Sequence, residues 1–127
     1  MHLPTKIVLL ITLSLIASVS SADVGDGKWF VEACSLDSLK RLEQESKDKY
    51  LSQLAYCNAF VMGLIHDHYA SRAAYRAQPL FCLPQGRSNF ELTGDVVGIV
   101  QSQPERQDTF AAALALQGLA RMYPCKN

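Results

Sequence analysis

The stretch from residue 78 to residue 86, Gln-Pro-Leu-Phe-Cys-Leu-Pro-Gln-Gly, limits more than any other how this chain can fold. Pro79 and Pro84 lack amide donors and push the residues before them toward extended geometry, so a helix cannot continue through this stretch. Between the prolines lie apolar side chains that do not suit an exposed loop: Leu80, Phe81 and Leu83. We therefore expect a joint between two helical regions, pinned into the core and cross-linked there through Cys82.

The N-terminus has the pattern of a secretory signal peptide. His2 and Lys6 precede an apolar run over residues 7–17, and small residues at 20–22 form a site that a signal peptidase reads. The apolar run is too short to span a membrane. We expect residues 1–22 to be removed, residues 23–127 to form one exported domain, and no membrane association after this cleavage.

The charges of the chain are balanced, with 12 Lys and Arg residues against 12 Asp and Glu residues. Such a chain has no long-range field that would attract nucleic acid or an anionic membrane. Many of the charges lie in residues 35–49, where both signs are mixed. We interpret this segment as a solvated face, with a second short helix carried by Leu36, Leu39 and Leu42.

Four cysteines follow the signal peptide: Cys34, Cys57, Cys82 and Cys125. An even number in an exported chain indicates two disulfides rather than a metal site. The four are too dispersed for a zinc knuckle. If the three long helices run antiparallel, Cys125 comes near Cys82, and Cys34 then pairs with Cys57. The other two connectivities stay open at the level of sequence.

The first half of the exported chain shows two helical patterns. Asp26 can cap a short helix over residues 27–34. Residues 49–75 carry an apolar stripe at spacings of three and four. The members of this stripe are Leu54, Cys57, Val61, Leu64 and His68. Ala59 and Gly63 leave a groove of small residues on the long helix, which we expect an internal helix to fill.

The second half shows two more helices. Ser88 and Glu91 form a capping box that opens a helix ending near residue 101. Its predicted buried side consists of Phe90, Val96, Val97, Ile99 and Val100. Gly94, Gly98 and the β-branched residues would also allow a strand here, but the capping box favours a helix. Asp108 can cap a last helix over residues 109–123. We predict an all-α fold, a small disulfide-bonded bundle of four or five helices.

The sequence lacks the residue patterns of an enzyme or a metal site. His66 and His68 are two residues apart, so on a helix they point in different directions, and we expect one to be packed and one solvated. There is no HExxH, GxSxG or glycine-rich phosphate loop. Cysteines joined in disulfides cannot act as nucleophiles. We therefore predict a protein without catalytic residues, metal or cofactor.

Two polar surfaces are predicted to bind a partner. The first is the turn from residue 101 to residue 108, in which Pro104 restricts the conformation. Its polar side chains are Gln101, Ser102, Gln103, Glu105, Arg106, Gln107 and Asp108. The second lies near the end of the long helix, where Arg72 and Arg76 accompany Tyr69 and Tyr75. The alternative is an ordinary solvated connector for the turn, and side chains snorkelling around a helix end for the second surface.

Several segments, in this order, resemble the Rap1a/Tai family of immunity proteins. They are Cys-Asn-Ala-Phe-Val-Met-Gly at 57–63, Phe-Cys-Leu-Pro at 81–84, the helix that leads into Pro-Glu at 104–105, the Ala- and Leu-rich run at 112–119, and Tyr-Pro-Cys at 123–125. Gln103 stands where the family pattern has a histidine. The resemblance covers about residues 54–125.

This resemblance implies a small, helical, disulfide-bonded protein of the Gram-negative periplasm, one of a group that is often dimeric. Members protect a cell from cell-wall-degrading effectors, often peptidoglycan amidases, that type VI secretion delivers. We therefore expect this chain to bind and inhibit such an effector and to form a homodimer. The alternative is an acid-stress chaperone or a general interaction protein of the periplasm.

Overall fold

A computed structural model describes residues 25–126 of the chain; the predicted signal peptide lies outside the described residues. The described part contains five α-helices and one short 3-10 helix, in the following order: α1 (Gly27–Cys34), α2 (Leu36–Glu45), α3 (Lys47–Ala74), α4 (Asn89–Gln101), η2 (Pro104–Arg106) and α5 (Ala111–Met122). Within residues 25–126 the extended pairing amounts to an isolated bridge between Asp26 and Phe110. The predicted all-α class is confirmed, and the strand alternative for α4 is wrong.

Side-chain caps begin four of the five α-helices in the part of the chain that the structure describes. The Asp26 side chain accepts a hydrogen bond from the Trp29 N–H and caps α1, and both halves of the Ser88–Glu91 capping box are present at α4. The predicted Asp108 cap is wrong. The last helix begins at Ala111, whose N–H donates to the Gly25 carbonyl at 3.1 Å. The N-terminal segment thus satisfies a helix N–H that the sequence assigned to a side-chain cap.

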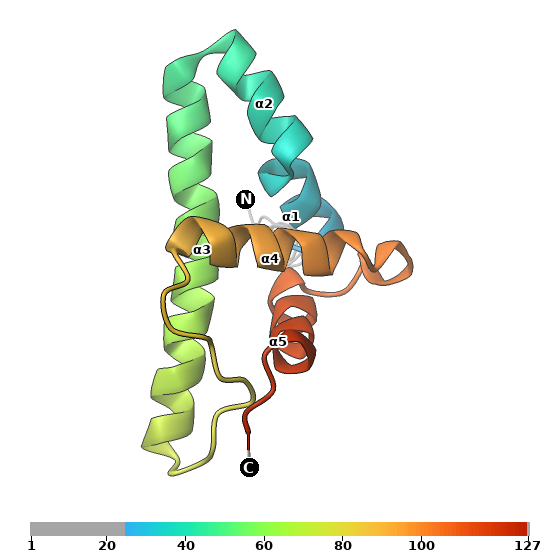
Figure 1. Ribbon diagram of the computed structural model, residues 1–127. Coiled ribbons are helices and arrows are strands. Elements are labelled where there is room, and N and C mark those ends of the chain that lie inside the picture. Colours follow the sequence, from blue (N-terminus) through green and yellow to red (C-terminus); the bar gives the residue numbers. More distant parts are fainter. Residues whose placement is uncertain (1–24, 127) are drawn as a thin grey trace, which may run out of the picture.

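The helices do not form a simple antiparallel bundle (Figure 1). The α2–α3 hairpin extends to one side, and α4 crosses α3 rather than running along it. Short α1 packs against all four other α-helices. The short helix α1 is therefore the element around which the other helices assemble, although the sequence predicts only that it forms.

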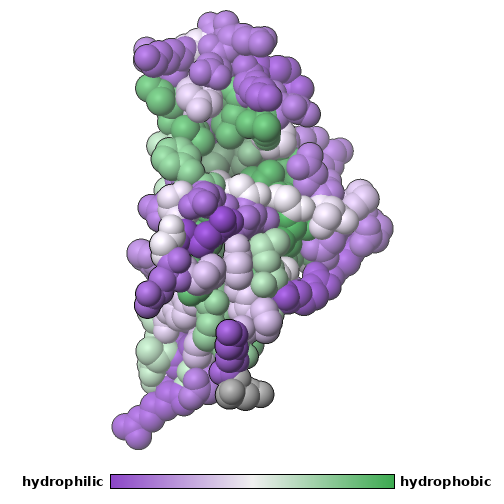
Figure 2. All heavy atoms as spheres, viewed as in Figure 1, coloured by the Kyte–Doolittle hydropathy of each residue, from purple (hydrophilic) through white to green (hydrophobic). Residues whose placement is uncertain are grey.

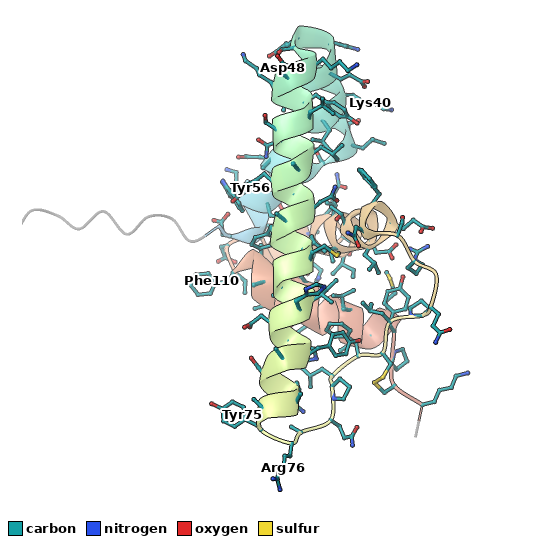
Figure 3. The ribbon with its side chains drawn as sticks, turned by 90° about the vertical axis from the view of Figure 1, so that its left-hand side faces the viewer. Lys40, Asp48, Tyr56, Tyr75, Arg76 and Phe110 are labelled. Carbon is teal, nitrogen blue, oxygen red and sulfur yellow. A yellow bond between two sulfur atoms is a disulfide. The ribbon has the colours of Figure 1, made fainter. Side chains whose placement is uncertain are left out.

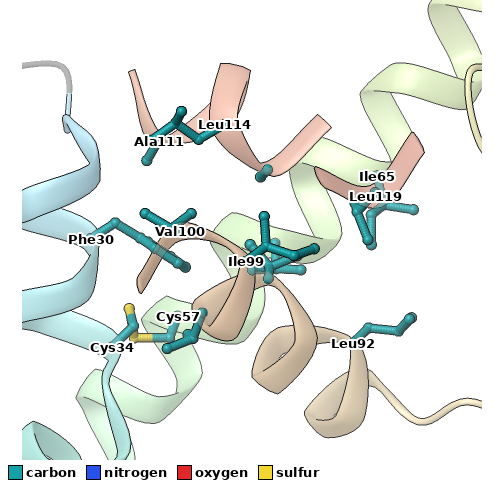
Figure 4. Close-up of a cluster of buried hydrophobic side chains, with 14 of the residues drawn as sticks. Phe30, Cys34, Cys57, Ile65, Leu92, Ile99, Val100, Ala111, Leu114 and Leu119 are labelled. Atoms are coloured by element: carbon teal, nitrogen blue, oxygen red, sulfur yellow. A yellow bond between two sulfur atoms is a disulfide. The ribbon is translucent and has the colours of Figure 1, made fainter. Parts of the chain in front are cut away.

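The core forms where α1, α3, α4 and α5 meet (Figure 4). Its largest fully buried side chains are Phe30, Phe81, Leu114, Leu119, Val61, Val96 and Val100. Each large aliphatic or aromatic side chain buried in this way contributes about 1.5–3 kcal/mol. Two members of the predicted set are not buried, since Phe90 is 62% exposed and Leu80 is 50% exposed.

The outer face of α3 is uncovered and nearly bare of long side chains (Figure 3). Ala59 and Gly63 both lie on this exposed face. No described atom outside the helix lies within 4 Å of the position that a Gly63 Cβ would take. The prediction that an internal helix fills this groove is wrong, because α4 and α1 pack on the opposite side of α3, against Val61 and Ile65.

Both predicted disulfides are confirmed: Cys34 bonds to Cys57, and Cys82 bonds to Cys125. The first ties α1 to α3 within the core. The second ties the joint to the C-terminal segment, where the Cys82 N–H also donates to the Tyr123 carbonyl at 2.8 Å. The antiparallel helices expected to bring Cys125 near Cys82 are absent. The two cysteines meet because the joint itself runs back to the end of α5.

A polar network holds the other side of the joint. Asp95 on α4 accepts hydrogen bonds from the Arg87 guanidinium and from the Tyr123 hydroxyl. These bonds to Asp95 raise the pKa of Tyr123 and of Arg87. The joint, α4 and the C-terminus are therefore linked by one carboxylate, which no local sequence pattern indicates.

The joint is pinned to α3 by His68. The buried imidazole stacks on Phe81, with ring centroids 4.5 Å apart, and its Nε2 accepts from the Leu80 N–H at 3.1 Å. His66 is exposed, so the prediction of one packed and one solvated histidine is confirmed. Burial and the nearby Arg72 lower the pKa of His68 below its ordinary value of 6.5, against the opposing effect of Asp67.

We expect the free energy of unfolding to fall as the pH drops below about 6.5. The unfolded chain takes up the His68 proton at its ordinary pKa, whereas the folded chain must go to a lower pH, so acid favours unfolding. Protonation would also remove the Nε2 acceptor. Hydrogen bonding from the Ser88 backbone lowers the pKa of Glu91 below 4.5, so its effect begins at lower pH. Urea unfolding between pH 7.5 and 5 measures the slope.

The control is His66→Gln, which should keep the pH slope of stability. His68→Phe should flatten it while lowering stability at pH 7.5, because the Leu80 N–H loses its acceptor. An unchanged slope in His68→Phe would show that other groups cause the acid response.

Candidate functional site

The turn between α4 and α5 is held by hydrogen bonds of the main chain. At its far end, the Gly27 N–H donates to the Thr109 carbonyl and the Lys28 N–H donates to the Gln107 carbonyl, both at 2.9 Å. Near its middle, η2 adds a short turn that begins at Pro104. The beginning of α1 therefore fixes the conformation of a segment that the sequence could place only between two helices.

Three of the predicted binding residues hold the turn from inside. The Gln103 amide donates to the Ile99 carbonyl at 3.0 Å, and its oxygen accepts from Arg106 at 3.3 Å and from Arg121 at 3.4 Å. Arg106 also donates to Gln117 on α5 at 3.0 Å. All three polar side chains on the turn that are half-buried, namely Gln103, Arg106 and Gln107, make such bonds.

The remaining side chains of the turn project into solvent. The exposed residues are Gln101, Ser102, Pro104, Glu105 and Asp108. Within residues 25–126, the Glu105 carboxylate has neither a hydrogen-bond partner nor a salt-bridge partner. The turn thus divides into an inner set that fixes its shape and an outer set that presents donors and acceptors; within the outer set, the Ser102 hydroxyl also donates to the Ile99 carbonyl at 2.8 Å. Gln103, Arg106 and Gln107 were expected only to bind a partner, and their hydrogen bonds to other elements give them a structural role as well.

A shallow hollow of about 540 Å³ lies beside the turn, between η2 and α5. Its lining includes Arg106, Arg121 and Met122. At its base Gly118 lets α5 approach α4, because a Cβ at this position would lie 2.0 Å from the Ile99 Cγ2 atom. The role of Gly118 could not be predicted, because its only signal in the sequence is a glycine inside an Ala- and Leu-rich helix.

The second predicted surface lies at the C-terminal end of α3 (Figure 3). Arg72 donates to the Gln78 carbonyl at 2.6 Å and so supports the joint. Tyr69 likewise donates to the Phe81 carbonyl at 3.1 Å. Tyr75 is 85% exposed, and Arg76 has a φ of 52°, at the helix-ending position that usually carries glycine. Only Tyr75 and Arg76 of this group present their side chains outward.

The described residues contain no group of three or more His, Cys, Asp or Glu side chains placed to hold a metal ion. Among residues 25–126, none of the helices combines the length and the apolar character that a membrane span requires.

The fold and the turn define a small all-α protein, closed by two disulfides, that presents polar side chains on one rigid connection. A family model described as Rap1a immunity proteins matches residues 26–125. The chain therefore belongs to the Rap1a immunity protein family. No curated protein and no solved structure matches the chain at a significant level.

Proposed function

We propose that this chain is a periplasmic immunity protein that binds and inhibits a type VI secretion effector, a peptidoglycan amidase. Membership of the Rap1a family is the observation that carries this proposal, and it favours this function over that of a chaperone. The predicted signal peptide over residues 1–22 would supply the export. Homodimerisation through a helix face stays a prediction that sedimentation can test.

The turn is the part of the chain that best suits an enzyme cleft. A cleft that grips a polar peptide needs hydrogen-bonding groups opposite its own, and Gln101, Ser102, Glu105 and Asp108 present them. Because the inner hydrogen bonds already fix the turn, little conformational entropy is lost when it binds. We infer that the projecting turn enters the cleft and excludes the substrate. The surface around Tyr75 and Arg76 is the second proposed contact.

We expect Glu105→Lys to weaken binding of the effector by at least about tenfold, which corresponds to about 1.4 kcal/mol. The variant reverses the charge of the one carboxylate at the tip of η2, and Glu105 has no partner in the described fold whose loss would unfold it. Titration calorimetry with a secreted peptidoglycan amidase, taken first from the genes that neighbour this one, measures the affinity. Release of peptides from purified peptidoglycan measures the inhibition.

The matched control is Glu45→Lys, the same charge reversal at the end of α2, far from the turn (Figure 1). It should leave the affinity unchanged. Arg106 is less suitable for this test, because its replacement also releases the turn from Gln117. Equal affinities of wild type and Glu105→Lys would move the binding site to another surface, and failure of the wild-type chain to bind or inhibit any neighbouring effector would refute the proposed function.

A further inference from the structure

An open apolar groove lies between α2, α3 and one face of α4, with a volume of about 370 Å³. Leu36 and Leu39 come from α2, and Leu54 comes from α3. On α4 the lining residues recur at helical spacing, from Phe90 through Gly94 and Gly98 to Gln101, so they form a floor roughly 16 Å long. Figure 2 shows apolar side chains gathered between α2 and α3, beside α4.

The fold itself does not use this space. Leu36 is 64% exposed and Phe90 is 62% exposed. No described atom outside the helix lies within 4 Å of the position that a Cβ would take at Gly94 or at Gly98. Glycine inside a helix lowers its stability relative to alanine, so α4 carries two unfavourable residues that no internal packing requires. An occupant from outside the chain gives them a reason.

The groove and the turn adjoin each other. Gln101 lines the groove and is also the first residue of the turn, so a partner seated on the turn reaches the end of the groove. The turn alone offers five projecting residues, whereas a stable interface uses about 20 to 30 residues on each side. Interfaces of this kind also have an apolar centre within a polar rim. The turn supplies polar contacts inside the cleft, and the groove supplies the apolar surface.

We propose that this groove receives an apolar segment of the effector enzyme, with an aliphatic or aromatic side chain lying over Gly94 and Gly98. The segment is uncharged, because none of the side chains that line the groove is ionisable. This inference rests on the proposed function and adds a second contact to it, next to the turn.

The test fills the groove without disturbing the helix. Gly98→Leu places a side chain in the open space above α4, and Gly63→Leu makes the same change on the bare face of α3. With the amidase of the Glu105→Lys experiment as the probe, we expect Gly98→Leu to weaken binding by at least about tenfold and Gly63→Leu to leave it unchanged. Circular dichroism should show equal helix content in both variants.

A second pair removes apolar surface instead of adding it. Leu36→Ala trims the rim of the groove, while Leu51→Ala trims a side chain of α3 that is 48% exposed and lies outside the groove lining. We expect only Leu36→Ala to weaken binding. The dye 8-anilinonaphthalene-1-sulfonate provides a direct probe: its fluorescence should rise with the wild-type chain, fall when the amidase is added, and stay low with Gly98→Leu.

The outcomes separate the two proposals. If Glu105→Lys weakens binding while Gly98→Leu and Leu36→Ala do not, the groove inference is wrong and the proposed function stands. If Gly98→Leu changes a dimer to a monomer in sedimentation without changing the affinity, the occupant is a second copy of this chain, which also overturns the inference. If the wild-type chain does not bind the amidase, both fail together.

Discussion

Replacing Gly118 with alanine is expected to lower the free energy of unfolding by about 2–3 kcal/mol. The added Cβ would lie 2.0 Å from Cγ2 of Ile99 and 3.1 Å from its Cβ. Ile99 cannot easily move aside, because it is buried and because a β-branched side chain in a helix has one strongly preferred rotamer. The helices α4 and α5 must separate instead. Urea unfolding of the two proteins measures the difference.

Gly63→Ala is the matched comparison, because it makes the same substitution in the middle of a helix. Here no neighbour stands in the way, so we expect the free energy of unfolding to rise by about 0.5–1 kcal/mol through the higher helix propensity of alanine. Changes of the same sign and size in both variants would contradict the close approach of α5 to α4. Since Gly118 lines the hollow beside the turn, its variant should also weaken effector binding.

The sequence predicted the features that short-range chemistry determines. A side-chain oxygen that accepts from an N–H three residues later needs no tertiary contact, so the caps at Asp26 and Ser88 could be identified directly. The prolines of the joint likewise separate α3 from α4 at the expected place. The first helix was predicted over its full observed range, Gly27–Cys34.

The sequence does not show which part of an apolar helix face is covered by another element. Phe90 lies seven residues before Val97 on the same side of α4, yet Phe90 at the start of the helix is 62% exposed while Val97 is 8% exposed. The small residues Ala59 and Gly63 have the spacing of a packed groove, yet they face solvent. Periodicity shows that a helix has an apolar face; the crossing of two helices decides how much of that face is buried.

For the candidate site, the position of the turn could be predicted from the sequence. Which of its side chains hold the turn and which project from it could not. Gln103 and Arg106 look like surface residues because they are polar and follow a helix. Their partners, Gln117 and Arg121, lie 11 to 18 residues further along the chain. Such long-range bonds leave no local pattern, so the sequence assigned inner and outer side chains of the turn to the same role.

Removing either disulfide is expected to cost several kcal/mol, and the two losses should differ in their effect on binding. The Cys82–Cys125 bridge closes a separation of 43 residues, for which the loop-entropy relation gives about 4 kcal/mol. The Cys34–Cys57 bridge spans 23 residues, which gives about 3 kcal/mol. Both cysteines of the shorter bridge are also buried, at 3% and 0% exposure, so alanine there additionally removes core packing.

We therefore expect similar losses of about 4 kcal/mol for Cys82→Ala with Cys125→Ala and for Cys34→Ala with Cys57→Ala. Either loss is large against the 5–15 kcal/mol that stabilises a typical domain. Urea unfolding of the two double-alanine variants measures the loss of stability, and calorimetry with the amidase measures their affinity for it.

Binding distinguishes the two bridges because of what each holds in place. The Cys34–Cys57 bridge fixes α1, and the start of α1 carries the Gly27 and Lys28 N–H groups that hold the far end of the turn. Its removal should weaken effector binding even at a temperature where the variant stays folded. The Cys82–Cys125 bridge holds the joint and the C-terminus, which do not touch the projecting residues, so its removal should lower stability and leave affinity unchanged. The opposite result, weaker binding only after loss of Cys82–Cys125, would place the effector on the joint rather than on the turn.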